Sequence, residues 1–191
     1  MVRRNLRYAA PMSKTPPPKR VTKTSLENAA LHYLERFSAS AESLRRVLMR
    51  RVVRAAAAHG DDPEDGAAMV EALIVRYRDT GLLDDHRFAE AKSQSLLRRG
   101  TPLRSIRQAL CQKGVDADLV DTVLGDLRDE FALRGDEADL AAALAYVRRR
   151  RLGPYRPADL RAAYRDRDLA SMGRAGFSWQ LARRVIDGET E

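Results

Sequence analysis

The sequence predicts an all-α protein made of three tandem three-helix repeats stacked into an elongated curved array. Apolar residues recur at helical spacing through almost all of the 191 residues, and no sustained alternating run of β-branched residues indicates a strand. The same three-helix pattern also returns along the chain at a fixed offset. Three short helices bury little apolar surface alone, so neighbouring repeats are expected to stack.

The first repeat is delimited by clear start and stop signals. The T-x-x-E capping box of Thr24–Glu27 predicts a helix over about 25–37. Ser40 is placed to cap a second helix that ends near Gly60. A third helix follows an acidic turn and stops at Gly81.

The second repeat follows the same order. Asp84 or Asp85 caps its first helix, and Thr101-Pro102 supplies the cap and the first-turn proline of its second helix. Gly114 ends that helix, and Asp116 opens the third one.

The third repeat completes the series. It is expected to hold helices over about 136–151 and about 157–173, and a short helix capped by Ser178. Trp179 begins this last helix, and we expect its ring to lie in the core.

The repeat offsets fix which positions are equivalent. A shift of 62 residues aligns Leu48 with Leu110 and, separately, Leu124 with Ile186, so each pair is expected to occupy equivalent core positions. The third helix of the first repeat aligns at an offset of 50, which leaves about 12 extra residues near 52–64. The expected domains are a basic, proline-containing flexible tail (1–23) and three repeats (24–81, 82–133 and 134–191).

The formal charge of +8 is concentrated at the N-terminus. Residues 1–23 contain seven basic residues and no acid, so the rest of the chain carries only +1. The prolines of this segment prevent a continuous helix, and we expect a mobile arm that adds nonspecific contacts to phosphates. In the body, a basic segment (87–113) precedes an acidic one (114–139), so basic and acidic surfaces are expected to alternate.

No motif indicates an enzyme, a cofactor site or a metal site. The three histidines His32, His59 and His86 are scattered, no phosphate-binding glycine loop occurs, and the lone Cys111 has no partner for an internal disulfide. No apolar run approaches the roughly 18 residues that span a bilayer, and the basic N-terminus leads into prolines. We therefore expect a cytoplasmic protein without membrane contact.

Basic side chains repeated along the array are the candidate binding residues. Arg46, Arg50 and Arg54 are spaced by four and share one helix face, away from the apolar stripe. Arg45 and Arg107 are equivalent in the repeat and are expected to be reachable by a partner, whereas Leu169 occupies this position in the third repeat. The full candidate set is Arg45, Arg46, Arg50, Arg51, Arg54, Arg98, Arg99, Arg104, Arg107, Lys113, Arg148, Arg149, Arg150 and Arg151.

Some of these arginines are expected to be neutralised. The four consecutive residues 148–151 point to every side of a helix, so some of them are expected to pair with acids of the preceding third helix. A solvated, salt-bridged surface without a binding role is the simpler reading of such clusters.

A segment of the second repeat resembles the RecX family. The resemblance lies in Gly81-Leu82-Leu83-Asp84-Asp85-His86-Arg87-Phe88-Ala89-Glu90, Arg98-Arg99-Gly100, Ile106-Arg107-Gln108-Ala109-Leu110 and Lys113-Gly114-Val115. It is close over about 81–127, and weaker agreement extends into the first and third repeats. The tail and the extra residues near 52–64 depart from the family pattern.

The resemblance implies three tandem three-helix repeats and a regulatory role on RecA, the recombinase that polymerises on single-stranded DNA. It implies binding along the groove of the RecA filament, limitation of its ATPase, strand-exchange and co-protease activities, and a secondary contact with single-stranded DNA. We expect a monomer. A helix-turn-helix transcription regulator formed by 101–114 and 116–127 is the alternative, although a recognition helix rich in Asp would be repelled by phosphates. A purely structural scaffold is the third reading.

Overall fold

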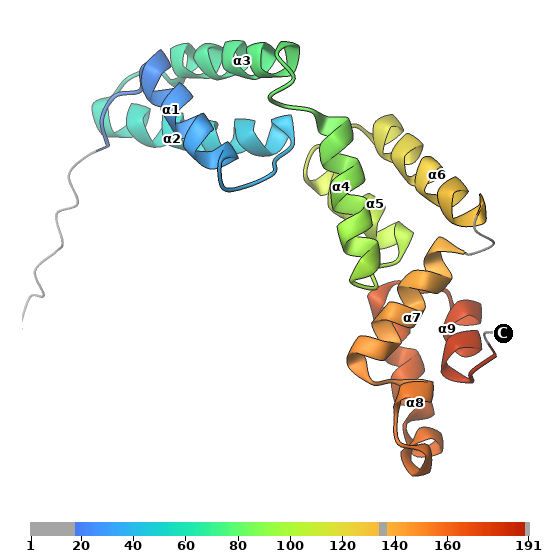
Figure 1. Cartoon of the computed structure of the whole chain (residues 1–191). Helices are drawn as coiled ribbons and strands as arrows, with labels where there is room; N and C mark the ends of the chain where they lie inside the picture. The colour runs from blue at the N-terminus through green and yellow to red at the C-terminus, as the bar shows by residue number, and fades with distance from the viewer. Residues whose placement is uncertain (1–17, 134–136, 190–191) are drawn as a thin grey trace, which may run out of the picture.

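The computed structural model describes residues 18–133 and 137–189 (Figure 1). Within these ranges the chain forms nine α-helices and one short 3-10 helix, and no strand occurs. The all-α fold class is therefore confirmed. The predicted flexible tail falls mainly on residues 1–17, which lie outside the described residues.

Unit 1, as we call the first three helices, contains α1 (Lys23–Leu34), α2 (Ala41–His59) and α3 (Pro63–Asp79). Helix α2 begins after the Ser40 cap and ends at Gly60, as the sequence predicts. Gly60 has a φ of 68°, a left-handed conformation that glycine adopts without steric cost.

Helix α1 begins two residues earlier than predicted. The Thr22 hydroxyl accepts a hydrogen bond from the Ser25 backbone N–H, and the Ser25 hydroxyl oxygen accepts one from the Thr22 N–H. The capping box is therefore Thr22–Ser25, and the prediction of Thr24–Glu27 is wrong. Glu27 instead forms an ion pair with Arg76 of α3, which holds α1 against α3. Ahead of this cap, His59 Nε2 lies 2.8 Å from the Pro18 carbonyl oxygen, so the last part of the predicted tail contacts unit 1.

Unit 2 and unit 3, defined in the same way, follow the predicted order. Unit 2 contains α4 (Asp85–Arg98), α5 (Leu103–Gln112) and α6 (Ala117–Leu133). Unit 3 contains α7 (Ala138–Arg150), the 3-10 helix (Gly153–Tyr155), α8 (Ala158–Ala175) and α9 (Trp179–Ile186).

Burial agrees with the repeat offsets. Leu48 and Leu110 are 1% and 0% exposed, and Leu124 and Ile186 are 1% and 7% exposed, so each pair occupies equivalent core positions. The second helices differ in length, with 19 residues in α2 and 10 in α5. The extra residues of unit 1 therefore lengthen α2 rather than form a separate loop.

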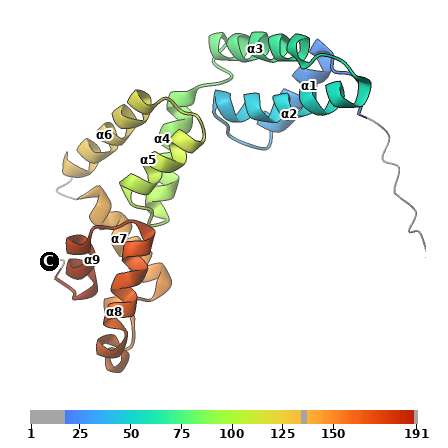
Figure 2. The ribbon, with the colours of Figure 1, turned by 180° about the vertical axis from the view of Figure 1, so that it is seen from behind.

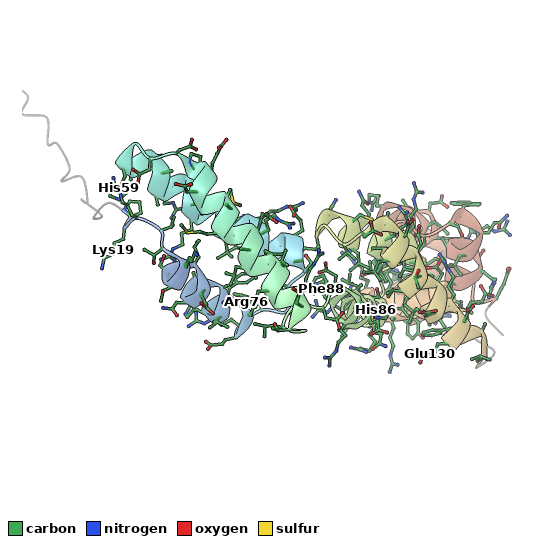
Figure 3. All side chains as sticks on the ribbon, turned by 90° about the horizontal axis from the view of Figure 1, so that it is seen from above. Lys19, His59, Arg76, His86, Phe88 and Glu130 are labelled. Carbon is green, nitrogen blue, oxygen red and sulfur yellow. The ribbon has the colours of Figure 1, made fainter. Side chains whose placement is uncertain are left out.

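The three units share two hydrophobic cores. One core lies within unit 1 and includes Leu26, Leu48 and Ile74. The other runs without interruption through units 2 and 3, from Phe88 to Ile186. The ribbon correspondingly shows unit 1 set at an angle to a longer body formed by units 2 and 3 (Figures 1 and 2). In Figure 3, Lys19 and His59 mark the end of unit 1 far from this body, and His86 and Phe88 mark the start of unit 2.

The second helices of the three units are joined head to tail by the same contacts. The Ser43 hydroxyl, at the start of α2, donates to the Lys113 carbonyl at the end of α5, at 3.4 Å. Its repeat equivalent Ser105, at the start of α5, donates to the Ala175 carbonyl at the end of α8, at 3.2 Å. Each positive helix N-terminus therefore faces the negative C-terminus of the next second helix, which is a favourable dipole arrangement.

A carboxylate from the following unit completes each of these helix starts. The Ala41 N–H of α2 donates to Asp85 Oδ1, and the Leu103 N–H of α5 donates to Asp139 Oδ1, both at 2.8 Å. Thr101 does not cap α5, contrary to the prediction, because this distant carboxylate takes the role of the local cap. Asp84, not Asp85, caps α4 itself.

Candidate nucleic-acid and partner interface

Arg45 and Arg107 form the same ion pair in units 1 and 2. Arg45 on α2 binds Glu71 on α3, with Nε–Oε1 at 2.6 Å, and it also binds Glu42. Arg107 on α5 binds Asp121 on α6, with Nε–Oδ1 at 2.7 Å. These hydrogen bonds raise the pKa of both guanidinium groups and lower the pKa of Glu42 and Asp121. The two arginines join the second helix of a unit to its third helix, so their charges are already neutralised.

The predicted ridge of Arg46, Arg50 and Arg54 is divided by the structure. Arg46 binds the Glu42 carboxylate and, across the junction with unit 2, donates to the Gln112 carbonyl oxygen at 2.9 Å. Arg50 and Arg54 are exposed and have no ion pair or hydrogen bond from their side chains within the described residues. Only these two members of the ridge, with the neighbouring Arg51, present free charge.

The junction of units 2 and 3 carries further free basic side chains. Arg98 and Arg99 are exposed at the end of α4 and form no side-chain ion pair in the described part of the chain. The adjacent Gly100 lies directly against α7, since a Cβ atom there would be 2.6 Å from the Tyr146 backbone nitrogen. Elsewhere on unit 2, Arg104 on α5 and Lys113 at the end of α5 that faces unit 1 are also exposed and unpaired within that part.

The four arginines 148–151 do not pair as predicted. None of them forms an ion pair with an acidic residue in the described ranges, and all four are exposed. The guanidinium of Arg150 lies over the Tyr146 ring, 5.3 Å from its centroid. Arg151 adopts a left-handed conformation, with φ of 55°, and ends α7. The expected neutralisation is therefore wrong. Arg148–Arg150 lie instead in the last turn of α7, where the helix dipole stabilises cations.

A groove with an exposed aromatic ring, that of Phe37, was not predicted from the sequence. A groove of about 570 Å³ between α1 and α2 is lined by Tyr33, Phe37, Arg36 and Arg51. The Tyr33 and Phe37 rings are 5.1 Å apart, and Phe37 is 55% exposed. Tyr33 is half-buried against the core of unit 1, whereas Phe37 follows the end of α1 at Leu34 and is not covered by the helix.

The prediction that Trp179 lies in the core is wrong. It is 63% exposed at the first residue of α9. Side chains in helices lean toward the N-terminus, so the ring at this position extends past the end of α9 instead of lying on its body. The buried aromatic ring of this region is that of Phe177. It packs edge-on against the Tyr146 ring, with the two ring centroids 5.5 Å apart.

Unit 3 also brings together arginines that were absent from the candidate set. Arg156, Arg167 and Arg174 line a cavity of about 350 Å³ with Arg150. The only carboxylate lining this cavity is Asp168, which is 1% exposed. Burial favours its neutral form, but hydrogen bonds from Arg156 and from the Gly153 N–H outweigh this effect and lower the pKa of Asp168. Arg150 ends α7 and Arg156 follows the 3-10 helix, whereas Arg167 and Arg174 share one face of α8. No local sequence pattern therefore united the four arginines.

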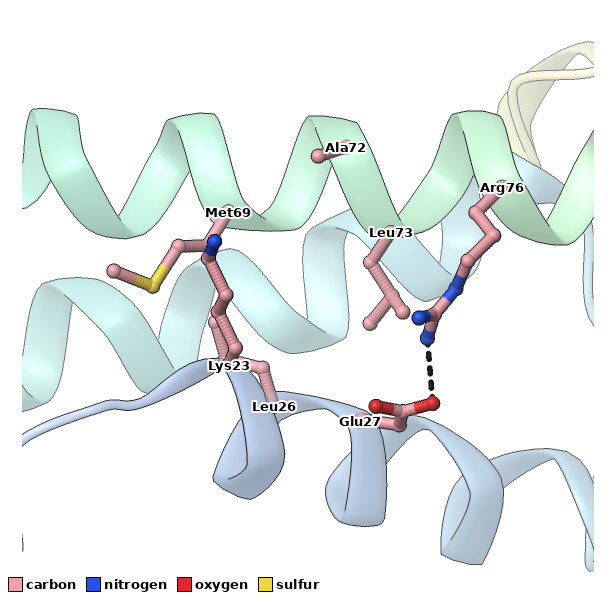
Figure 4. Close-up of a pocket in the computed structure, with 7 residues that line it drawn as sticks. All are labelled: Lys23, Leu26, Glu27, Met69, Ala72, Leu73 and Arg76. Atoms are coloured by element: carbon pink, nitrogen blue, oxygen red, sulfur yellow. Dashed lines mark hydrogen bonds and ion pairs between the residues drawn. The ribbon is translucent and has the colours of Figure 1, made fainter.

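Another cavity differs in its charge balance. Between α1 and α3, a pocket of about 230 Å³ is lined by apolar side chains together with Lys23, Glu27 and Arg76 (Figure 4). Arg76 and Glu27 are joined there by an ion pair, as the dashed line in Figure 4 shows. One of its two cations is therefore neutralised, and the pocket is mainly apolar.

Metal-ligating side chains are scattered through the described ranges. No group of three or more His, Cys, Asp or Glu side chains is arranged there to hold a metal ion. Among the helices of these ranges, none combines the length and apolar character needed to cross a bilayer.

Comparison with known proteins gives one consistent family. A model of the second three-helix domain of RecX matches residues 84–124. The protein named regulatory protein RecX from Myxococcus xanthus is 43% identical over 171 residues, which cover 89% of this chain and 88% of the relative. The regulatory protein RecX of Halorhodospira halophila is 35% identical, with 87% and 89% covered, and that of Agrobacterium fabrum is 27% identical, with 86% and 83% covered. No solved structure matches the chain.

Proposed function

We propose, because this chain belongs to the RecX family, that it binds the filament of RecA on single-stranded DNA and limits the ATPase, strand-exchange and co-protease activities of RecA. The chain is a regulatory protein and not an enzyme. The proposed partner is the groove of the RecA filament, and direct contact with single-stranded DNA is secondary. We further propose that the protein is a cytoplasmic monomer.

The observation that carries this proposal is the row of free cations along a bent helical array. Unpaired arginines occur on α2 of unit 1, at the end of α4 in unit 2 and at the end of α7 in unit 3. The head-to-tail second helices give successive units a repeated arrangement. A regular polyanionic assembly such as a nucleoprotein filament offers complementary charge at repeated intervals.

The test compares free arginines with neutralised ones. RecA ATPase on single-stranded DNA is titrated with the wild type, with the double variant Arg50→Gln/Arg54→Gln and with the control Arg45→Gln/Arg107→Gln. Both variants lose two positive charges, but only the first pair is free in the described chain. We expect the first variant to require several-fold more protein for half-inhibition and the control to resemble the wild type. The opposite order would restore the sequence-based prediction that Arg45 and Arg107 bind the partner.

A pull-down identifies the partner. RecA filaments, free RecA and bare single-stranded DNA are compared at matched salt, because contacts with phosphates weaken steeply as salt increases. Preference for the filament supports the proposal, whereas equal retention on bare DNA contradicts it.

A helix-turn-helix transcription regulator remains the second candidate. Helices α5 and α6 have the required order, but α6 carries Asp118, Asp121 and Asp126 where a recognition helix would meet phosphates. A sequence-selective footprint on duplex DNA without RecA would favour this candidate.

A further inference from the structure

The cavity in unit 3 concentrates more positive charge than its single carboxylate offsets. Four of its lining side chains are arginines, and Asp168 is the only acid among the lining residues. Asp168 Oδ1 accepts a hydrogen bond from Arg156 Nη2 at 2.7 Å, and Oδ2 accepts one from the Gly153 N–H at 2.9 Å. The single carboxylate is thus engaged by Arg156, and in the described ranges Arg150, Arg167 and Arg174 form no hydrogen bond or ion pair with an acid.

Aromatic rings position three of the four arginines. The Arg156 and Arg167 guanidinium carbons lie 4.4 and 5.8 Å from the centroid of the Tyr164 ring, and Arg150 lies over Tyr146. A guanidinium that contacts a ring face keeps N–H groups at its edge available for a ligand. Such contacts orient Arg150 and Arg167 without pairing them with a carboxylate.

The polar lining suits an oxygen-rich anion. Ser171 contributes a hydroxyl to the cavity, and its oxygen lies 3.0 Å from the Tyr146 hydroxyl. Guanidinium groups bind phosphate oxygens through paired, charge-assisted hydrogen bonds. Close cations repel one another, so an anion between them is more favourable than an empty site. The α1–α3 pocket of Figure 4 has no such group of unpaired cations, because its arginine, Arg76, is paired with Glu27.

We propose that this cavity, the unit 3 arginine pocket, binds a phosphate group, and, resting on the proposed function, that the group is a phosphodiester of the single-stranded DNA in the filament. The end of α4 with Arg98 and Arg99 approaches the pocket, because Gly100 abuts Tyr146, the residue over which Arg150 lies. A strand held in the pocket therefore has further cations beside it across the junction of units 2 and 3.

The test measures DNA binding by the full chain without RecA. A fluorescent oligothymidylate of about 15 nucleotides is titrated with the wild type, with Arg167→Gln/Arg174→Gln and with the control Arg183→Gln/Arg184→Gln. The control removes the same charge from the same unit, but its arginines pair with Asp187 and Glu137 outside the pocket. Circular dichroism verifies the fold, which is expected to persist because Arg167 and Arg174 are exposed and make no hydrogen bond in the described chain.

We expect the pocket variant to bind the oligonucleotide about tenfold more weakly and to lower the slope of the log–log salt dependence by about 0.7, the contribution of the one phosphate held in the pocket. The control is expected to retain the wild-type slope. A third variant, Arg167→Lys/Arg174→Lys, keeps the charge but loses the paired donors, and intermediate affinity is expected. Equal affinity and slope for pocket variant and control overturn the assignment to DNA.

A titration with inorganic phosphate shows whether the pocket binds free phosphate or a phosphodiester of DNA. If millimolar phosphate raises the melting temperature of the wild type but not of the pocket variant, and oligonucleotide binding is unchanged, the pocket binds a free phosphate and not DNA. If neither ligand distinguishes the variants, the pocket proposal fails, and loss of RecA binding alone would assign the pocket to an acidic protein surface. RecA ATPase is measured separately, so DNA binding through the pocket without inhibition would refute the proposed function and leave the pocket intact.

Discussion

Substitution of Leu48 or Leu110 by alanine tests whether the two hydrophobic cores unfold independently. They are equivalent in the repeat and are 1% and 0% exposed, but Leu48 belongs to the core of unit 1 and Leu110 to the core shared by units 2 and 3. Truncation of a buried leucine to alanine costs about 2–5 kcal/mol. Because no buried apolar cluster joins the two cores in the described chain, Leu48→Ala is expected to destabilise unit 1 alone, and Leu110→Ala only the other body.

Calorimetry on the full chain measures this separation. A loss of about 2 kcal/mol lowers the melting temperature of a domain of this size by about 8–16 °C. Leu48→Ala is expected to move one heat-absorption transition and leave the other in place, and Leu110→Ala to do the reverse. Amide hydrogen exchange assigns each transition to its helices. A single transition shifted equally by both substitutions would refute the reasoning, since it would mean that the junction couples all three units.

Three further predictions concern glycine, helix starts and acid. Gly100→Ala is expected to destabilise units 2 and 3 by more than about 2 kcal/mol, because its Cβ would lie 2.6 Å from the Tyr146 nitrogen. Gly60→Ala, with similar φ and nothing within 4 Å, is expected to cost only about 1–2 kcal/mol in chemical denaturation, and equal costs would contradict the steric argument. Asp139→Ala is expected to cost about 0.5–2 kcal/mol and to accelerate exchange of the Leu103 amide, whereas an unchanged exchange rate would show that the carboxylate is not its cap. The lowered pKa of Asp168 contributes stability that is present above its unfolded pKa and is lost as the pH falls through the folded pKa, so thermal melts of units 2 and 3 are expected to decline below about pH 4. Asp168→Asn is expected to flatten this decline, and an identical pH profile would exclude Asp168 as its cause.

Sequence reasoning succeeded where the signal is local. Ser40 and Gly60 bound α2 because a hydroxyl before a helix and a glycine after it act on backbone groups within one turn. It failed where two local signals compete, as in the overlapping frames Thr22–Ser25 and Thr24–Glu27. Glu27 pairs instead with Arg76, 49 residues away, a tertiary contact that the local pattern does not contain.

The candidate interface was less predictable for the same reason. Repeat equivalence correctly related Arg45 to Arg107, but it did not show that each has an acid on the next helix, 26 and 14 residues away. The pairs are themselves part of the repeat, since Glu71 and Asp121 differ by the offset of 50 that relates the third helices. Which arginines keep a free charge depends on packing between helices, which one sequence does not encode locally.

The junction between units 1 and 2 is polar, and the long helix α2 magnifies any rotation that occurs there. The direct contacts of the junction include hydrogen bonds at the ends of α2 and α5 and the bond from Ala41 to Asp85. A cavity of about 540 Å³ with several polar lining residues lies beside it. Helix α2 extends from this point for 19 residues, a length of about 28 Å. A rotation of about 10° at the junction displaces the far end of α2 by about 5 Å, the rise of roughly one helical turn. The length of α2 thus turns a small rotation at the junction into a displacement of several ångströms at the far end of unit 1. The continuous core of units 2 and 3 keeps the rest of the array at a fixed length.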